Sequence, residues 1–141
     1  MSTIIVRLAE PRDFKAVQDI QVEGELLTGE SPIAIIDMEN KINDPRGVFG
    51  VAEIDNEIAG FIFGDKLTGR WSTVSYFVVS KKHRGTEVYK LLGEWFVDKV
   101  KEMGSKFVVM YADAENEKLV NFYKHFGFVA GGNYIEMIRE I

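Results

Sequence analysis

The chain has 141 residues, a mass of 16.0 kDa and a net charge of −5. This length predicts a single domain over residues 1–141 with one substantial hydrophobic core. The absence of cysteine excludes disulfides, a thiol nucleophile and thiolate metal ligands, and we expect no metal. The acidic balance disfavours binding to nucleic acid, which requires charge that neutralises phosphate. No apolar run approaches about 18 residues and the start lacks a signal-peptide pattern, so we expect no membrane span and a cytoplasmic location.

The first half of the chain predicts a strand, two helices and three further strands. Pro11 suits the first turn of a helix, and Phe14 and Val17 begin a moderate apolar stripe at helical spacing. Asp55-Asn56-Glu57 separates two β-branched and aromatic runs, which is typical of a tight hairpin. The expected elements are a strand over Ser2–Leu8, a helix from Pro11 to Gln21, a weaker helix over Pro32–Ile42, and strands over Val48–Ile54, Ile58–Leu67 and Thr73–Val79.

The second half predicts two amphipathic helices, each followed by a strand. Apolar residues recur at helical spacing before Gly104, which can cap the end of the first helix. A second apolar stripe, from Leu119 to Phe126, is closed by Gly127 in the same way. The expected elements are a helix over Gly85–Met103, a buried strand over Lys106–Tyr111, a helix around Leu119–Phe126 and a last strand over Tyr134–Ile141.

The predicted order of elements is β-α-α-β-β-β-α-β-α-β. A hairpin-rich half followed by a βαβ crossover indicates a mixed sheet covered by helices. The chain has no visible linker, repeat or low-complexity tract. We therefore expect one α/β (α+β mixed sheet) layered domain.

The first candidate site is the junction between the strand that ends at Val79 and the helix that follows it. Free backbone N–H groups and the positive end of the helix dipole favour an anion at such a junction. The loop also carries the basic cluster Lys81-Lys82-His83-Arg84 within an acidic protein. A phosphate-bearing ligand would fit here, although the same residues would also form an ordinary solvated loop.

The second candidate site is the segment Asn116–Phe128. Asn116 follows a predicted strand, and its side-chain amide could join that strand to the next helix. Tyr123 lies beside Phe122 on the apolar stripe, so its ring could be buried while its hydroxyl reaches a polar pocket. A phenol with a pKa near about 10 can donate a proton to a leaving thiolate. The alternative is a core tyrosine whose hydroxyl has a structural partner.

Together the two segments resemble the GNAT acetyltransferase family. That family has an Arg/Gln-x-x-Gly-x-Gly/Ala loop after its fourth strand and a later Asn-x-x-Ala-x-x-Phe/Leu-Tyr-x-x-x-Gly-Phe segment. Leu119 replaces the usual Ala of the second pattern, and Val6-Arg7-Leu8-Ala9 looks like the usual opening of the family. The order of elements is also similar. The second pattern matches here at Asn116, Phe122, Tyr123, Gly127 and Phe128.

The resemblance implies an N-acetyltransferase that moves an acetyl group from acetyl-CoA to a primary amine of a small molecule or a protein. The amine would attack the thioester directly, so no protein nucleophile is required. Tyr123 would protonate the thiolate of coenzyme A and contact the cofactor, and Asn116 would contact the pantetheine region. The strand end Phe77, Val78 and Val79 would pair with the pantetheine arm. The pyrophosphate would lie on the loop and helix start formed by Arg84, Gly85, Thr86, Glu87, Val88 and Tyr89.

The loop departs from the family pattern at two positions. Counted from Arg84, Glu87 and Tyr89 stand where small residues would let the backbone approach a phosphate closely. Glu87 is expected in the first helical turn, where it would favour the helix dipole but repel a pyrophosphate if it points inward. Tyr89 could pack on the core or obstruct the cofactor groove. The alternatives are a non-catalytic binding or regulatory module with the GNAT fold and a homodimer that pairs through an exposed strand edge.

The sequence does not single out a general base or an acceptor. No acidic residue lies within Thr73–Val79, where several enzymes of the family place one. A chain of water molecules could replace a dedicated base. The acceptor is expected in a cleft between the loop Glu23–Pro32 and the strand around Thr73–Tyr76. Candidate bases by location are Asp113, Glu25 and Glu30.

Overall fold

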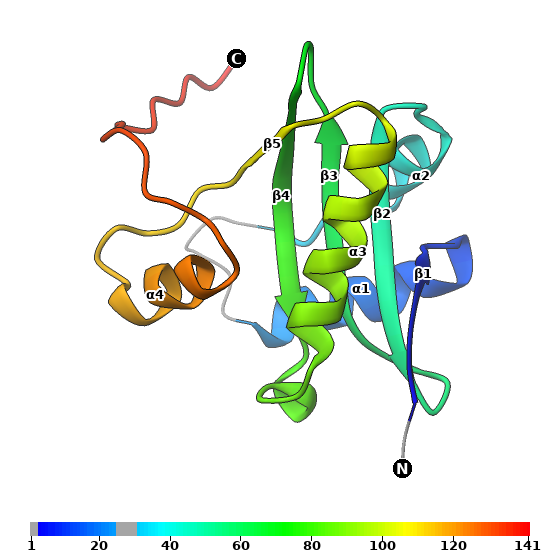
Figure 1. Cartoon of the computed structure of the whole chain (residues 1–141). Coiled ribbons are helices and arrows are strands. Elements are labelled where there is room, and N and C mark those ends of the chain that lie inside the picture. Colours follow the sequence, from blue (N-terminus) through cyan, green and yellow to red (C-terminus); the bar gives the residue numbers. More distant parts are fainter. Residues whose placement is uncertain (1–2, 25–30) are drawn as a thin grey trace. The chain divides into compact units, whose positions relative to one another are not determined.

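The computed structural model describes residues 3–24 and 31–141 (Figure 1). Contacts between residues divide the chain into two compact units, Met1–Met110 and Tyr111–Ile141, and each is described by itself. The elements of the first unit are β1 (Ile4–Leu8), the 3₁₀ turn η1 (Pro11–Asp13), α1 (Phe14–Glu23), α2 (Ile35–Asn43), β2 (Gly47–Ile54), β3 (Glu57–Lys66), β4 (Trp71–Val79), the 3₁₀ turn η2 (Lys81–His83), α3 (Val88–Glu102) and β5 (Phe107–Val109). The second unit contains α4 (Glu117–His125).

The first unit is built on a five-stranded sheet in the order β1-β2-β3-β4-β5, and its mixed character is as the sequence predicts. The pairs from β1 to β4 are antiparallel, whereas β4 and β5 are parallel. The expected hairpin joins β2 to β3, where Asp55 and Asn56 have φ values of 51° and 65°. Two consecutive residues with positive φ form the type of turn whose twist matches paired strands, and Asn and Asp tolerate this conformation well.

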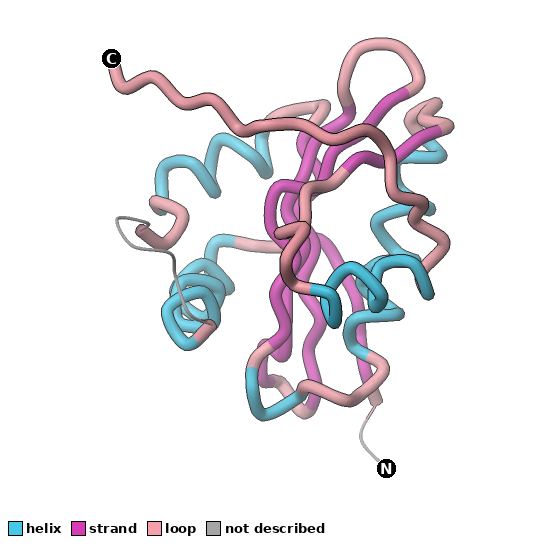
Figure 2. The backbone as a smooth tube through the Cα atoms, turned by 90° about the vertical axis from the view of Figure 1, so that its left-hand side faces the viewer, coloured by secondary structure: helices cyan, strands magenta, loops and turns pink. Residues whose placement is uncertain are grey.

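Helices cover both faces of this sheet, with α3 on one side and α1 and α2 on the other (Figures 1 and 2). The strands are therefore buried on both faces and read as continuous apolar runs in the sequence. The face covered by α3, which we call the α3 face, includes Val48, Ile62, Val79, Leu92 and Phe96. The opposite face, the α1–α2 face, includes Phe14, Met38, Phe49, Phe61 and Phe63.

A buried ion-pair network fixes the start of the chain to the sheet. The Arg7 guanidinium donates to both carboxylate oxygens of Asp13 at 2.8 and 2.9 Å, and to Glu53 at 3.1 Å. Burial alone would raise the pKa of Asp13, but hydrogen bonds from Arg7 and from the Glu10 backbone N–H, with the positive charge of Arg7, hold it below its usual range. Asp13 therefore stays ionised in the folded protein.

The second unit begins with a turn and continues into α4, whose C-terminus forms a Schellman motif. Gly127 has a φ of 89°. Its N–H donates to the carbonyl of Lys124 at 3.0 Å, and the Phe128 N–H donates to the carbonyl of Tyr123 at 3.1 Å. The Gly127-Phe128 pair identified in the sequence therefore ends this helix.

The prediction of a last strand over Tyr134–Ile141 is wrong. These residues have no regular secondary structure, and the side chains of Tyr134, Ile135, Met137 and Ile138 are all more than four-fifths exposed. A strand requires partners for its backbone N–H and C=O groups, and the described structure assigns this segment to no sheet. Within the described ranges, no helix is long and apolar enough to cross a bilayer.

Candidate functional site

Strand β4 is paired along its whole length on one side but only at its start on the other. Its residues Trp71–Thr73 pair with β5, and this pairing ends at Thr73 and Val109. A register shift against β3 follows immediately, because Phe63 pairs with Tyr76 and Gly64 pairs with Val74. From Val74 to Val79, no strand in the described part of the chain pairs with the β5 side of β4. This edge offers N–H and C=O groups to an extended ligand that carries amides.

Phe77, Val78 and Val79 lie at the end of this open edge. They pair with β3 on the other side, at Ile62, Phe61 and Gly60 respectively. Their side chains alternate between the faces, since Phe77 and Val79 pack on the α3 face and Val78 packs on the α1–α2 face. Packing on both sides makes this end of β4 a rigid element.

The loop after β4 leads directly into the N-terminus of α3. Gly85 has a φ of 82°, a conformation that residues with a Cβ rarely adopt. The Thr86 hydroxyl accepts a hydrogen bond from the Val88 N–H at 3.4 Å. The helix therefore begins at Val88 and not near Gly85, and Glu87 is its exposed N-cap residue instead of part of the first turn. The Glu87 side chain makes no capping hydrogen bond.

Tyr89 packs against the core instead of standing in the loop. Its ring centroid lies 5.2 Å from that of Phe77, and both rings contact the apolar cluster of the α3 face. Of the two arrangements left open by the sequence for Tyr89, the structure has the packed one.

Two contacts tie this loop to the C-terminal end of α1. A Glu23 carboxylate oxygen accepts the Lys81 N–H at 2.7 Å. The Arg84 Nε donates to the Val79 carbonyl at 3.4 Å, and its guanidinium lies close to Gly24. Arg84 is exposed, and the hydrogen bond that its Nε forms within the described residues is long at 3.4 Å, so its guanidinium can reach an anion.

The second unit contains Asn116 and Tyr123. Asn116 is the N-cap of α4, and its Oδ1 accepts the Leu119 N–H at 3.1 Å. Tyr123 is 9% exposed and packs edge-on against the rings of Phe122 and Phe128, at centroid distances of 5.5 and 5.9 Å. The Schellman motif thus fixes the Tyr123 ring from two sides. The role of Asn116 and Tyr123 toward a cofactor stays a prediction.

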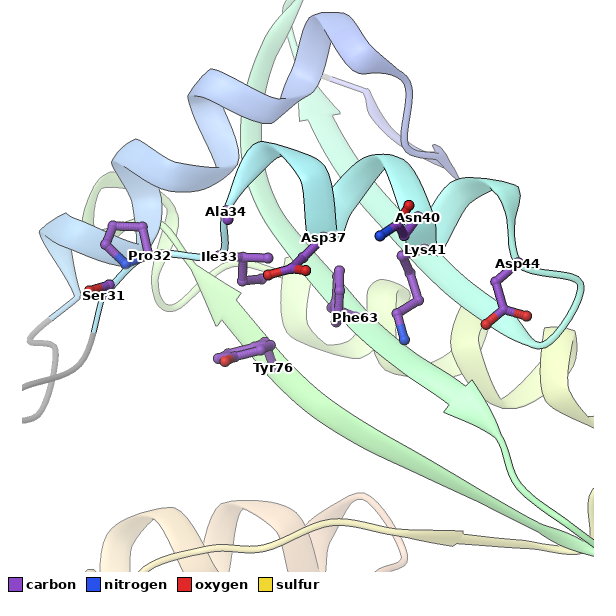
Figure 3. A pocket seen from close by; sticks show the side chains of 10 residues that line it. All are labelled: Ser31, Pro32, Ile33, Ala34, Asp37, Asn40, Lys41, Asp44, Phe63 and Tyr76. Carbon is purple, nitrogen blue, oxygen red and sulfur yellow. The ribbon is translucent and has the colours of Figure 1, made fainter. Parts of the chain in front are cut away.

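A pocket of about 630 Å³ opens on the α1–α2 face (Figure 3). The segment before α2 and the aromatic rings of Phe63 and Tyr76 form part of it, and these rings meet edge-to-face at 5.7 Å. It shares Pro32 and Tyr76 with the cleft predicted from the sequence, whereas residues 25–30 of the predicted loop lie outside the described residues. The full lining is Ser31, Pro32, Ile33, Ala34, Asp37, Asn40, Lys41, Asp44, Phe63 and Tyr76.

The contribution of α2 to the lining of this pocket was not predicted from the sequence. Asp37, Asn40, Lys41 and Asp44 follow the spacing i, i+3, i+4 and i+7, so they share one side of the helix and face the pocket. This polar stripe was visible in the sequence, but such a stripe normally marks the solvated side of a helix. Lys41 forms a short ion pair with Asp65 on β3, and its ammonium lies 4.8 Å from the centre of the Phe63 ring.

Two glutamines of α1 hold the rim of this pocket. The buried Gln21 accepts the Ile33 N–H at 2.7 Å, and Gln18 donates to the Ile33 carbonyl at 2.9 Å. The backbone N–H and C=O of Ile33 therefore both have side-chain hydrogen-bond partners. This arrangement fixes the chain just before α2 without a strand or helix partner.

The structure describes only one of the three candidate general bases. Glu25 and Glu30 lie outside the described residues. Asp113 lies in the second unit, where its carboxylate accepts the Glu115 N–H at 3.0 Å and so stabilises the turn before α4. Within the described ranges, no group of three or more His, Asp or Glu side chains could hold a metal ion.

Comparison with known proteins places this geometry in a family. The acetyltransferase (GNAT) family matches residues 14–128. An aminoglycoside N-acetyltransferase solved in complex with CoA is similar with a TM-score of 0.85 and 15% identity, over 100% of this chain and 97% of that chain. A ribosomal-protein-alanine N-acetyltransferase from Brucella melitensis biovar Abortus 2308 has a TM-score of 0.75 and 19% identity, with 99% of each chain covered. A transcriptional regulator from Bacillus halodurans C-125 has a TM-score of 0.78 and 20% identity, over 97% of this chain and 100% of that chain.

A search of curated protein sequences gave no match. At the identities above, the solved structures establish a shared fold and carry no activity with them. The family match is broader evidence, because it covers most of the chain and includes both the loop after β4 and the Asn116–Phe128 segment. The chain belongs to the acetyltransferase (GNAT) family.

Proposed function

We propose that this protein transfers an acetyl group from acetyl-CoA to a primary amine. The observation that carries the proposal is the open edge of β4 from Val74 to Val79, which ends beside the N-terminus of α3. Amide groups of a pantetheine arm can pair with the backbone of Phe77–Val79. The adjoining loop at Arg84–Thr86 and the start of α3 at Val88 offer positive charge and a helix dipole to a pyrophosphate.

The residues present fit this co-substrate. Tyr89, which could have obstructed the groove, packs on Phe77, and Glu87 is an exposed N-cap. Acetyl-CoA supplies an activated thioester, so the chain needs no nucleophile of its own. This is consistent with the absence of cysteine. The rival proposal is a binding module with a closed phosphate site, and the exposure of Glu87 and the packing of Tyr89 on Phe77 favour an open loop over it.

The protein's own part in the reaction is to align the amine and the thioester and to provide a proton to the departing thiolate. The open edge of β4 orients the thioester, and the acceptor nitrogen forms the new C–N bond while the C–S bond breaks. Tyr123 holds a proton at its phenolic oxygen for the departing thiolate. The proton lost by the amine passes to water, because no single carboxylate of the described residues stands out as the base.

Isothermal titration with acetyl-CoA tests the proposal. We expect binding, and we expect Arg84→Met to weaken it about tenfold, because a hydrogen bond to a charged group contributes about 1.5 kcal/mol. Arg139→Met removes the same charge from the exposed C-terminal segment and should leave affinity unchanged. Absence of binding by the unmodified protein at millimolar acetyl-CoA would exclude the proposed function.

The role of Tyr123 requires a separate measurement of turnover. Tyr123→Phe keeps the ring that packs on Phe122 and Phe128 but removes the proton donor. We expect kcat to fall by about 100-fold with little change in the affinity for acetyl-CoA. Tyr134→Phe, at an exposed position of the same unit, is the matched control. An unchanged kcat would remove Tyr123 from the mechanism and leave water as the acid.

A further inference from the structure

We infer that the pocket between α2 and strands β3 and β4 binds the amine acceptor, and that it selects an amine with a second positive charge, such as a linear diamine. Binding of a diamine in this pocket does not depend on catalysis. The role of the diamine as acetyl acceptor rests on the proposed function. Three features of the pocket support it, namely its charge, its aromatic floor and its position beside the open edge of β4.

The charge of the pocket is negative. Asp37 and Asp44 line it, and no ion pair to either carboxylate occurs among the residues that the structure describes. Lys41 is the basic residue of the lining, and Asp65 neutralises it. Three carboxylates and one ammonium leave two negative charges. A monoamine uses one of them, and a diamine can use both.

Asp37 and Asp44 stand at opposite ends of the wall that α2 and its C-cap residue form. Seven residues separate Asp37 from Asp44, which corresponds to about 10 Å along the axis of α2. In Figure 3, Asp37 lies toward the end of the pocket that contains Ile33, and Asp44 lies at the far end beyond Lys41. A ligand that reaches both must be elongated, with its two charges at its ends.

The floor of the pocket is suited to an ammonium group. Lys41 already places its own ammonium 4.8 Å from the centre of the Phe63 ring. Tyr76 lies beside Phe63 and lines the same pocket, so its ring offers a second face to a bound cation. Pro32, Ile33 and Ala34 add apolar contacts for the methylene chain of a ligand. The volume of about 630 Å³ is in the range of small-molecule sites.

Tyr76 connects the pocket to the proposed reaction. It lies on β4, one residue after the register shift and one residue before Phe77. An amine held over Tyr76 is therefore adjacent to the open strand edge along which the thioester would lie. In this arrangement Asp37 faces the reacting end of the acceptor, and Asp44 holds the second charge.

Calorimetric titration of the full chain in the absence of CoA tests the binding. The probes are 1,6-diaminohexane and 1-aminohexane, which share a chain length and differ by one charge. We expect the diamine to bind at least about fivefold more tightly at low salt, with the difference shrinking at high salt. Equal affinities would overturn the inference.

Single-charge variants locate the effect. Asp44→Asn should weaken diamine binding by about threefold, the range of exposed ion pairs, and leave the monoamine unaffected. Asp37→Asn removes the charge at the reacting end and should weaken the binding of both amines by about threefold. Asn at position 44 can still accept the Arg46 N–H, so the turn after α2 is kept. Glu39→Gln changes the same charge on the same helix outside the pocket. An equal loss in Glu39→Gln would show a general charge effect and refute the site.

Mass detection of acetylated products in the presence of acetyl-CoA separates this inference from the proposed function. Preferential acetylation of the diamine supports both. Selective binding of the diamine without acetylation would sink the proposed function and leave the binding site standing. Acetylation of both amines with equal kcat/KM would sink the selectivity and leave the function standing.

Discussion

The two faces of the sheet use the same strands for opposite purposes. On the α3 face, glycines of β2 and β3 let the Trp95 and Phe96 rings of the helix approach the strands closely. On the α1–α2 face, large aromatic rings project from the sheet, and a polar pocket opens where α2 begins. The pocket on this second face is lined by the charged side chains of Asp37, Lys41 and Asp44. The difference indicates that the side of α3 that meets the sheet serves packing, whereas α2 leaves room for a ligand.

Glycine explains the closeness of the α3 face. A Cβ on Gly50 would collide with the Trp95 ring, and one on Gly64 would collide with the Thr73 carbonyl and lie 2.8 Å from Phe96. These glycines adopt ordinary strand conformations, so their role is to allow close approach and not to permit an unusual φ. Breaking this face should therefore have larger effects than breaking the other.

The largest expected effect is that of Gly64→Ala. The new methyl group must displace backbone at Thr73 as well as the Phe96 ring, and overpacking of this kind costs about 3 kcal/mol. Urea unfolding measures the loss, and failure to fold is the extreme of the same outcome. Gly131→Ala is the control, because no atom lies within 4 Å of its added Cβ. A stability unchanged within about 0.5 kcal/mol would contradict the tight packing described for this face.

The next effect concerns Asp13, which joins β1 to the start of α1. Asp13→Asn should lower stability at pH 7 by about 2 kcal/mol, because it leaves Arg7 without its main partner. The folded protein depresses the pKa of Asp13, so its contribution is present above the unfolded pKa of about 3.9 and is lost as the pH falls below it. Urea unfolding between pH 6 and pH 2 should therefore show a weaker pH dependence for Asp13→Asn.

Asp19→Asn is the matched control for this prediction. Asp19 pairs with Lys15 at 2.8 Å on an exposed side of α1, where such a pair contributes only a few tenths of a kcal/mol, roughly 0.3. If Asp13→Asn and Asp19→Asn had the same effect at every pH, the Arg7 network would have no special role.

A smaller and more local effect should follow from Gln21→Met. This change leaves the Ile33 N–H without its acceptor, at a cost of about 1–2 kcal/mol. Hydrogen exchange of the Ile33 amide should accelerate more than that of the α3 core, because the rim of the pocket opens locally. Gln21→Glu keeps an acceptor oxygen and should restore much of the protection. Uniform acceleration in both regions would indicate global destabilisation and reject a specific role for Gln21.

Comparison with the sequence predictions shows which features local patterns can carry. The three central strands were predictable, because burial on both faces leaves apolar runs such as Val48–Ala52. The Gly104 and Gly127 helix ends were predictable, because a left-handed residue after an apolar stripe favours glycine. The last strand over Tyr134–Ile141 has the composition of a strand, but pairing depends on a partner elsewhere in the chain, and a local pattern does not contain that information.

The candidate site divides in the same way. The loop around Arg84 was predictable from its junction between strand and helix, and the family resemblance supplied the segment around Tyr123. The polar stripe of α2 was missed, since only the tertiary arrangement turns it toward Phe63 instead of solvent. The glutamine contacts with Ile33 were missed for the same reason, because they join residues far apart in the sequence.

The smallest expected effect concerns Glu87, the residue that most clearly departs from the family pattern. Its carboxylate is exposed and makes no capping bond, so its repulsion of a bound pyrophosphate is screened by solvent. We expect Glu87→Gln to strengthen acetyl-CoA binding by only about twofold at low salt and not at all at high salt. Glu94→Gln, farther along α3, removes the same charge and should have no effect. A gain of tenfold or more in calorimetric titration would mean that the Glu87 carboxylate turns into the phosphate loop. The negative charge at Glu87 would then weaken cofactor binding, whereas the charge at Glu94 would not.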